Sequence, residues 1–296
     1  MPLKILLIYN PKAAHGRSLK ILPEVESEFI SRNVDFELRL TDYPEHAAAI
    51  VRDADLSAYD GLVAAGGDGT LFETVNGLMK NEGTRIPLGV LPVGTGNAFA
   101  RDIYQNAADW HEAVETIARN APRPVDVGKF TSHGESFYYL NILGLGFVAD
   151  VVDTTRRLKA FGNIAYTWSV VYQTLFLRAY ALKMEADGKT VERENIFVEI
   201  SNTRYTSNFL MAPAARIDDG LLDVTLLGRL TRRRLLGAFP KIFTGEHVHL
   251  PEVETFQAKR IRIETDPPKV LTPDGELTGI TPVEVECLHR AIKVFR

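Results

Sequence analysis

A short loop, Gly66-Gly67-Asp68-Gly69-Thr70, has the residue types that a phosphate-binding site requires. Its glycines let the backbone come close to a ligand and direct successive N–H groups toward it. The apolar run before the loop predicts a buried strand, and the apolar spacing after it predicts a helix whose N-terminus adds partial positive charge. Asp68 would repel a phosphate unless a divalent cation lay between them. The loop therefore predicts a nucleotide-phosphate site with a magnesium-facing acid.

Two further features surround this loop. Thr70 and Glu73 have the spacing of a capping box, which predicts that both side chains bond to the backbone at the start of one helix. A second glycine turn, Pro92-Val93-Gly94-Thr95-Gly96-Asn97, follows another apolar run. Packing alone explains a single such turn equally well, since glycines are common between strands and helices. The two loops together favour a ligand site.

The first half of the chain alternates apolar strands with amphipathic helices. Strands are predicted over residues 4–9, 34–40, 61–65 and 86–91. Such alternation predicts a parallel sheet, and ligands bind beyond the carboxyl ends of its strands. Polar residues follow these ends at Asn10, Thr41, Asp68 and Thr95. This convergence supports the site more strongly than any one motif.

The second half has a different texture. From Pro124 onward, β-branched and aromatic runs predict a hairpin over residues 125–145, a helical stretch at 150–182, and further strands at 196–201, 222–227, 256–264 and 283–286. The predicted fold is a parallel-sheet α/β nucleotide-binding domain, residues 1–124, followed by an antiparallel β-rich domain, residues 125–296.

Composition limits the classes of function. The 296 residues suffice for two cores, and the net charge of −4 gives no basis for nucleic acid binding. A single cysteine, Cys287, suits a reducing cytosol. The apolar stretches at the N-terminus and at residues 166–182 are too short or too interrupted for a membrane span. We expect a cytoplasmic protein.

Two turns of the second half carry acids beside glycine, Asp218-Asp219-Gly220 and Pro273-Asp274-Gly275-Glu276. Asp-Gly is a favoured turn dipeptide, so a plain β-turn explains each of them without function. Phosphoryl transfer to a hydroxyl, however, needs a carboxylate that accepts the hydroxyl proton. The first half offers no obvious base, and Glu276 is the most loop-like candidate. Glu276 as general base is a hypothesis.

The ordered motifs GGDGT, PVGTGNAFAR and DGE resemble the diacylglycerol kinase catalytic-domain superfamily, which includes soluble bacterial lipid kinases and the sphingosine and ceramide kinases. The resemblance covers nearly the whole chain. It implies a first domain similar to those of NAD kinase and phosphofructokinase, and a β-rich lipid-substrate domain whose last segment, about 281–296, returns to the first. It also implies ATP and Mg²⁺ as cofactors, with a hydroxyl-bearing lipid as substrate.

The resemblance assigns roles to individual residues. Asp68 would act through Mg²⁺, Glu276 would accept the lipid proton, and a second, structural Mg²⁺ would be held by the carbonyls of Arg216 and Leu221 and the side chain of Asp219. Together with the two glycine loops, it places the nucleotide at Asn10, Pro11, Lys12, Ala13, Ala14, Thr41, Gly66, Gly67, Asp68, Gly69, Thr70, Leu71, Phe72, Glu73, Gly94, Thr95, Gly96 and Asn97. The first loop, NPKAAHG, departs from the family because the expected glycine is displaced to Gly16.

Alternatives stay open at this point. An NAD kinase-like enzyme shares GGDGT, although its second motif differs from GTGNAFAR, and a catalytically silent lipid-binding protein would keep the fold. Basic-apolar clusters at residues 156–161 and 231–236 could contact an anionic membrane surface, but each equally suits the solvated face of an ordinary helix. We expect transient peripheral membrane contact. A homodimer is an open alternative.

Overall fold

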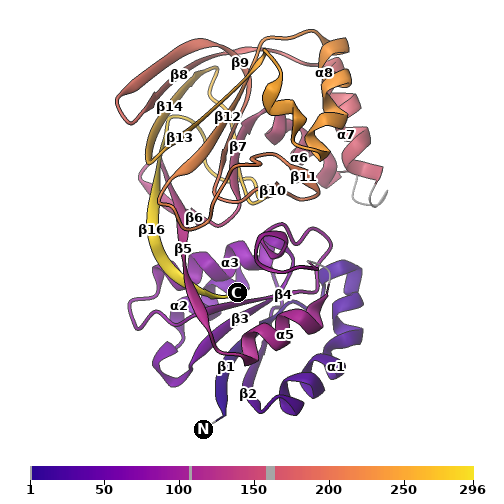
Figure 1. Cartoon of the computed structure of the whole chain (residues 1–296), viewed down its shortest axis with the longest axis vertical. Helices are drawn as coiled ribbons and strands as arrows, with labels where there is room; N and C mark the ends of the chain where they lie inside the picture. Colours follow the sequence, from indigo (N-terminus) through magenta and orange to yellow (C-terminus); the bar gives the residue numbers. More distant parts are fainter. Residues whose placement is uncertain (1, 107–108, 158–163) are drawn as a thin grey trace. The chain divides into compact units, whose positions relative to one another are not determined.

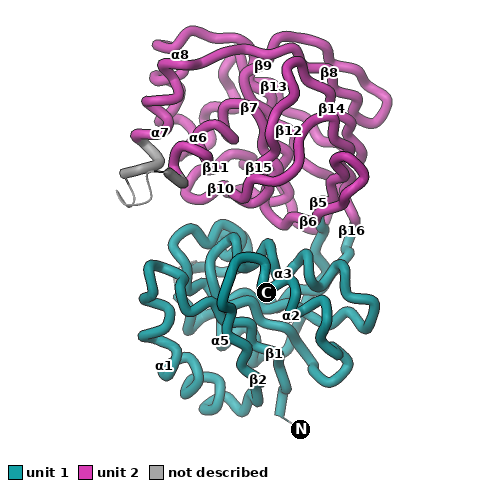
Figure 2. Tube along the Cα trace, turned by 180° about the vertical axis from the view of Figure 1, so that it is seen from behind, with its two compact units in different colours: residues 1–127, 289–296 teal, residues 128–288 magenta. Residues whose placement is uncertain are grey.

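The computed structural model describes residues 2–106, 109–157 and 164–296, which form two compact units. Unit 1 comprises Met1–Val127 and His289–Arg296, and unit 2 comprises Gly128–Leu288 (Figure 2). The boundaries between the units fall inside two strands, β5 (Pro122–Ser132) and β16 (Val283–Phe295). The C-terminal residues of β16 therefore belong to unit 1.

A parallel sheet forms the centre of unit 1. Its strands are β1 (Leu3–Tyr9), β2 (Val34–Leu40), β3 (Gly61–Gly66) and β4 (Leu88–Pro92), in the order β4-β3-β1-β2. The end of β16 pairs in parallel with β4 at Val294 and Leu88. Every residue of β3 and β4 is buried, which explains their unbroken apolar runs.

Helices flank the sheet of unit 1. They are α1 (Arg17–Ser31), α2 (His46–Asp53), α3 (Asp68–Lys80), α4 (Ala100–Ile103) and α5 (Trp110–Ala118), with short 3₁₀ turns η1 (Ala13–Gly16) and η2 (Leu56–Ala58). Alternate residues of β1, including Ile5 and Leu7, share one core with α1 and α5. Helix α2 packs against α3. The alternation of strand side chains thus gives each face of the sheet an apolar surface.

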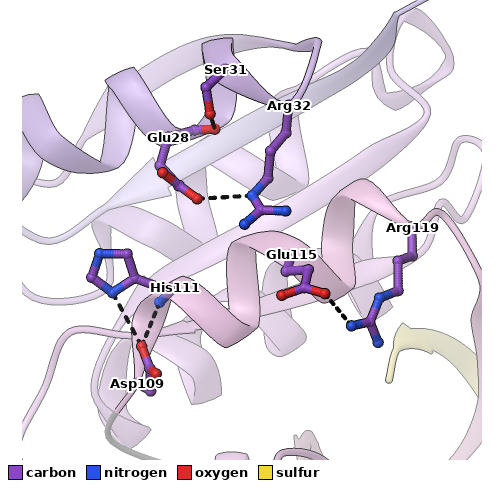
Figure 3. Close-up of polar contacts among 7 residues, drawn as sticks. All are labelled: Glu28, Ser31, Arg32, Asp109, His111, Glu115 and Arg119. Carbon is purple, nitrogen blue, oxygen red and sulfur yellow. Dashed lines mark hydrogen bonds and ion pairs between the residues drawn. The ribbon is translucent and has the colours of Figure 1, made fainter.

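The outer faces of α1 and α5 are solvated and carry ion pairs one helical turn apart (Figure 3). Glu28 pairs with Arg32 at 2.9 Å in α1, and Glu115 pairs with Arg119 in α5. The side chain of Asp109 caps α5 by accepting the N–H of His111 at 2.9 Å. Such exposed pairs contribute only a few tenths of a kcal/mol each, about 0.3–0.5, so the buried faces hold these helices in place.

The predicted capping box is wrong. Helix α3 begins at Asp68 with Gly67 as its N-cap, so Thr70 already lies inside the helix. The Glu73 carboxylate instead accepts the N–H of Glu45 at 2.8 Å and of Ala47 at 3.2 Å, at the start of α2. Glu73 therefore caps the neighbouring helix, because the first N–H groups of any helix need acceptors from outside it.

Unit 2 is built from antiparallel strands, as predicted (Figure 1). One path runs β13-β12-β9-β8-β14-β16, and β7 pairs with β9, β15 with β7 and β6 with β5. Besides β5 and β16, the strands are β6 (Glu135–Tyr139), β7 (Ile142–Gly146), β8 (Tyr180–Ala186), β9 (Lys189–Ser201), β10 (Tyr205–Thr206), β11 (Phe209–Leu210), β12 (Leu222–Gly228), β13 (Val253–Ala258), β14 (Arg260–Asp266) and β15 (Leu271–Pro273).

Helices of unit 2 gather at one end of it, α6 (Phe147–Arg157), α7 (Ile164–Leu175), α8 (Arg232–Ala238), η4 (Phe239–Phe243) and η5 (Glu246–His249). The helical stretch predicted to residue 182 ends earlier, since β8 begins at Tyr180 with strictly alternating burial. The single strand predicted over residues 256–264 is two strands, β13 and β14, because β13 pairs with β12 and β14 with β8. Among the described helices, none has the length and apolar character to cross a bilayer.

Candidate functional site

The order of the parallel strands reverses beside β1. β2 lies on one side of β1, whereas β3 and β4 follow on the other side. Ligands of such sheets bind beyond the carboxyl ends of the strands at this reversal. Asn10 follows β1 there, and the loop Gly66–Thr70 follows β3. The Asn10 N–H donates to the carbonyl of Ala65 at 2.9 Å, and Asn10 Nδ2 donates to Thr70 Oγ1 at 2.9 Å.

The loop after β1 is joined to the end of β2. Asn10 Oδ1 accepts the N–H of Lys12 at 2.9 Å, and Lys12 Nζ donates to the Asp42 carbonyl at 2.7 Å. The neighbouring Thr41 is buried, and its N–H donates to the carbonyl of Tyr9 at 2.9 Å. The structure thus brings together predicted site residues from the ends of three strands, β1, β2 and β3.

In the loop after β1, where the expected glycine is displaced to Gly16, the backbone is left-handed before and at that glycine. Ala14, His15 and Gly16 have φ values of 49°, 56° and 82°, so three successive residues are left-handed. A non-glycine residue in this region costs roughly 1–2 kcal/mol. Pro11 and Ala13, the other predicted residues of the loop, are partly exposed. The chain therefore places alanine and histidine at left-handed positions where glycine would be unstrained.

Asp68 is held between the two glycine loops. Its Oδ1 accepts the N–H of Ala98 at 2.7 Å. Burial raises the pKa of the Asp68 carboxyl to about 6, opposed by the N–H groups of Ala98 and Phe99 and by the charge of Arg101. A Cβ atom on Gly96 would overlap Asp68 Oδ2. Glycine at position 96 therefore lets the loop approach this carboxylate without displacing it.

The two glycine loops also contact each other directly. The Gly94 N–H donates to the Gly66 carbonyl at 3.0 Å, and a Cβ on Gly94 would overlap the backbone of Gly67. Asn97, with φ 51°, donates from Nδ2 to the Gly94 carbonyl at 3.1 Å. Its buried Oδ1 accepts no hydrogen bond from the part of the chain that the structure describes. Thr95 is exposed at the tip of the loop.

This arrangement suits both an anion and a cation. The N–H groups of Gly69 and Thr70 lie in the first turn of α3, where helical N–H groups have no acceptor within the helix, and they carry partial positive charge. The Asp68 carboxylate and Asn97 Oδ1 are oxygen donors of the kind that Mg²⁺ prefers. The residues present therefore fit a nucleotide phosphate with Mg²⁺. Of the other predicted residues, Leu71 and Phe72 are buried, and the Glu73 carboxylate caps α2.

The turn that carries Glu276 is described within unit 2. Asp274 and Gly275 have φ values of 47° and 83°, and the Glu276 N–H donates to the Pro273 carbonyl at 2.7 Å, which defines a type I′ turn. Asp274 is buried, and its carboxylate accepts the N–H groups of Leu140 at 3.1 Å and of Asn141 and Ile142 at 2.9 Å each. Asp274 thus fixes the turn, and Glu276 is partly exposed at its end.

Beside the Asp219 turn lies an acid that sequence reasoning missed, Asp223 of β12. Asp219 Oδ1 accepts the N–H of Leu221 at 3.0 Å, and the carboxylates of Asp219 and Asp223 lie 3.5 and 3.3 Å from Gln257 Nε2. Burial, aided by the charge of Asp219, raises the pKa of Asp223 to about 6. Within the described residues no three His, Cys, Asp or Glu groups gather for a metal. A cation here would need backbone carbonyls as well, and Arg216 and Leu221 flank the turn.

Unit 2 contains an apolar cavity of about 80 Å³, measured as the space that the centre of a water molecule can occupy. It is lined by Phe147, by Val170 of α7, by Leu235 of α8 and by Phe239 and Ile242 of η4, among others. The polar residues of its described lining are Glu199, Thr206 and His247. Burial raises the pKa of Glu199 to about 7, while Thr206 donates to it at 2.6 Å. A lone acid within the apolar strand IFVEIS was the signal that could have revealed Glu199.

Comparisons with known proteins identify the family of this chain. Residues 4–130 match the diacylglycerol kinase catalytic domain, and residues 142–296 match the YegS C-terminal NAD kinase beta sandwich-like domain. A diacylglycerol kinase of Bacillus subtilis is 30% identical over 97% of this chain and 94% of its own length. Sphingosine kinase 1 of Arabidopsis thaliana is 27% identical over 100% of this chain and 70% of its own.

The fold comparison points the same way. A Bacillus anthracis crystal structure, described as that of a candidate diacylglycerol kinase, superposes with a TM-score of 0.81 at 30% identity, covering 99% of this chain and 96% of that one. The predicted α/β plus β-rich fold and the predicted family are thereby confirmed. The chain belongs to the diacylglycerol kinase catalytic-domain family, and it is a lipid kinase of that family.

Proposed function

We propose that this lipid kinase transfers the γ-phosphate of ATP to the free hydroxyl of a diacylglycerol-like lipid, with Mg²⁺ at Asp68 and Glu276 as general base. The observation that carries the proposal is the position of Asp68, the first residue of α3, between two glycine loops at the reversal of the parallel sheet. The Bacillus subtilis relative is a diacylglycerol kinase, which supports diacylglycerol as the first substrate to test.

The backbone of unit 1 does most of the nucleotide binding in this proposal. The N–H groups at the start of α3 hold phosphate oxygens, and Asn10 and Thr41 shape the neighbouring loops. Bound Mg²⁺ would neutralise phosphate charge. The Ala98 N–H orients the Asp68 carboxylate, and the pKa of about 6 leaves that carboxylate ionised at neutral pH.

The carboxylate of Glu276 would take the proton. As the lipid oxygen forms its bond to the γ-phosphorus, the bond from that phosphorus to the β,γ-bridging oxygen breaks, and ADP leaves. The hydroxyl proton passes to Glu276. Asp274 supports this role because its three backbone contacts fix the turn that presents Glu276. We also assign a structural cation to the turn of Arg216, Asp219 and Leu221. A lipid substrate implies peripheral membrane contact.

The test measures Mg²⁺-dependent phosphorylation over a panel of diacylglycerol, monoacylglycerol and sphingoid lipids, with products identified by mass. We expect Glu276→Gln to lower kcat by about 10²–10⁴-fold while ATP binding is retained. Asp68→Asn should abolish the response to Mg²⁺. Glu185→Gln, an exposed position on β8, is the matched control and should leave turnover unchanged. Full turnover by Glu276→Gln would rule out Glu276 as the general base. If the wild type phosphorylates none of the lipids, the proposed reaction is refuted.

A further inference from the structure

Helix α7 presents an apolar stripe to solvent. Trp168, Val171, Tyr172, Leu175 and Phe176, here called the α7 stripe, have exposed fractions of 62%, 40%, 51%, 61% and 55%. Their spacing of three and four residues places them on one side of the helix and of the turn that continues it. The rings of Tyr172 and Phe176 lie 5.1 Å apart. Soluble helices ordinarily turn such a stripe toward a core.

The opposite side of α7 is already packed. Ser169, Val170 and Thr174 are 0%, 3% and 1% exposed, and Val170 lines the apolar cavity of unit 2. Gln173 Nε2 donates to Thr154 Oγ1 of α6 at 2.7 Å. These side chains already pack α7 against unit 2, and the exposed stripe lies on the other side of the helix.

The segment of α8 and η4 also has a buried apolar side and an exposed apolar side. Helix α8 packs against α7, and both lie at one end of unit 2 (Figures 1 and 2). Leu235 of α8 lines the cavity, whereas Leu236 is 42% exposed. In η4, Ile242 lines the cavity and Phe243 is 50% exposed. The same segments thus wall an apolar cavity on one side and expose apolar side chains on the other.

Basic side chains accompany these exposed apolar groups. Arg178 follows the α7 stripe, and Arg232 and Arg233 open α8, all of them exposed. Arg232 lies one turn before Leu236 and so shares its face of α8. Arg234, by contrast, pairs with Glu252 at 2.9 Å. Glu246 of η5 and Asp150 of α6 are exposed acids near these segments, so the three exposed arginines outnumber them in a chain whose net charge is −4.

We propose that the α7 stripe, together with Leu236, Phe243 and these arginines, is the surface that docks onto an anionic lipid bilayer. This inference rests on the proposed function only for its purpose, since a kinase of membrane lipids must reach its substrate there. The second basic cluster predicted from sequence, residues 231–236, belongs to this surface. The first, residues 156–161, lies largely outside the described residues.

A bilayer fits this surface better than a second copy of the chain. Trp and Tyr favour the interfacial layer of membranes, and arginines beside an apolar face complement anionic headgroups. A dimer would bring the same arginines of both copies to one interface, where like charges repel. The cavity behind the surface adds to this, because its apolar lining, which includes residues of α7, α8 and η4, suits a hydrocarbon chain.

The experiment measures binding of the full chain to vesicles of phosphatidylcholine alone and of phosphatidylcholine mixed with phosphatidylglycerol. We expect binding to the mixed vesicles only, reduced at least about tenfold in the triple variant Trp168→Ala, Leu175→Ala, Phe176→Ala. The matched control, Leu19→Ala with Ile30→Ala, removes exposed apolar groups of α1 and should bind as the wild type does. In a Trp110→Phe background, Trp168 is the remaining tryptophan, and its emission should shift to the blue on the mixed vesicles.

Equal vesicle binding by the wild type and the triple variant, or no change in Trp168 emission, overturns the proposal. The proposal is also overturned if the wild type is a dimer and the triple variant is a monomer with unchanged vesicle binding, because a second copy of the chain would then cover the stripe. Phosphorylation of a water-soluble short-chain diacylglycerol separates the two proposals. The triple variant should retain this activity, whereas a wild type that binds vesicles but phosphorylates no lipid would refute the proposed function and leave the docking surface standing.

Discussion

Asp274 offers the sharpest test of how the Glu276 turn is built. Its carboxylate accepts three backbone N–H groups and the residue is only 7% exposed. Asp274→Ala leaves these donors without the carboxylate, and each buried hydrogen bond to a charged group contributes about 1.5–3 kcal/mol. Relaxation and water entry recover part of this, so we expect a loss of about 3–5 kcal/mol in the free energy of unfolding.

The variant Asp274→Asn distinguishes the hydrogen bond to Leu140 from those to Asn141 and Ile142. Asparagine tolerates the positive φ, and its Oδ1 can still accept from Asn141 and Ile142. Only the N–H of Leu140 would face an amide NH₂ instead of an oxygen. We expect a loss of about 1–3 kcal/mol, which is smaller than that of the alanine variant.

The measurement combines urea unfolding with hydrogen exchange at the amides of residues 140–142, since local opening of this segment would appear there first. Asp187→Asn is the matched control. Asp187 also has a positive φ and accepts two N–H groups, of Lys259 and Arg260, but it is exposed, so its loss should stay below about 1 kcal/mol. If Asp274→Asn and Asp274→Ala cost the same, or if neither changes exchange at residues 140–142, the anchoring role is refuted.

Three further predictions concern unit 1. Burial raises the folded-state pKa of Asp68 to about 6, above the usual value of 3.8, so ionisation destabilises the fold as pH rises through this window. In the absence of Mg²⁺, Asp68→Asn should therefore stabilise the protein by about 1–3 kcal/mol at pH 8, and a gain that did not shrink between pH 6 and pH 4 in calorimetric titration would contradict this cause. Gly94→Ala should lower the free energy of unfolding by about 1–3 kcal/mol, because the new methyl group would overlap the backbone of Gly67. The control Gly237→Ala has open space around it in α8, so its thermal unfolding should be unchanged or shifted to higher temperature. Glu73→Ala should cost about 0.5–2 kcal/mol because α2 loses its cap, and unchanged exchange at the amides of Glu45 and Ala47 would show that the contact is dispensable.

The parts of the fold that sequence predicted are those set by local pattern. The short unbroken apolar run of β3 indicates a buried strand, and the glycine loops after β3 and β4 indicate the turns that follow strand ends. The dipeptide Asp274-Gly275 likewise predicted a turn, since both positions of this turn have a positive φ, which Asp and Gly tolerate. In each case the physical requirement falls on a few neighbouring residues.

The parts that sequence did not predict depend on distant partners. Glu73 has correct capping-box spacing, but the unsatisfied N–H groups that its carboxylate meets are those of α2. Residues 180–186, YALKMEA, alternate apolar and polar side chains and precede Asp187-Gly188, so the hairpin of β8 with β9 has a local signal that the predicted helix overlooked. The pairing of β8 with β14, residues 260–266, has no such signal. The burial of Asp223 likewise follows from its strand's neighbours. No window of local sequence contains these partners.

Acids in this chain divide by what surrounds them, and this division bears on which of them can act. Asp274 is saturated by backbone donors and therefore serves the turn, while Glu276, two residues later, is partly exposed. Asp68 is held by an N–H on one oxygen while burial raises its pKa to about 6, so a nearby cation would relieve the cost of its charge. If Mg²⁺ binds at Asp68 as proposed, aspartate at this position is costly without the ion and stabilised when the ion is bound, and this difference would set a metal-facing acid apart from a structural one.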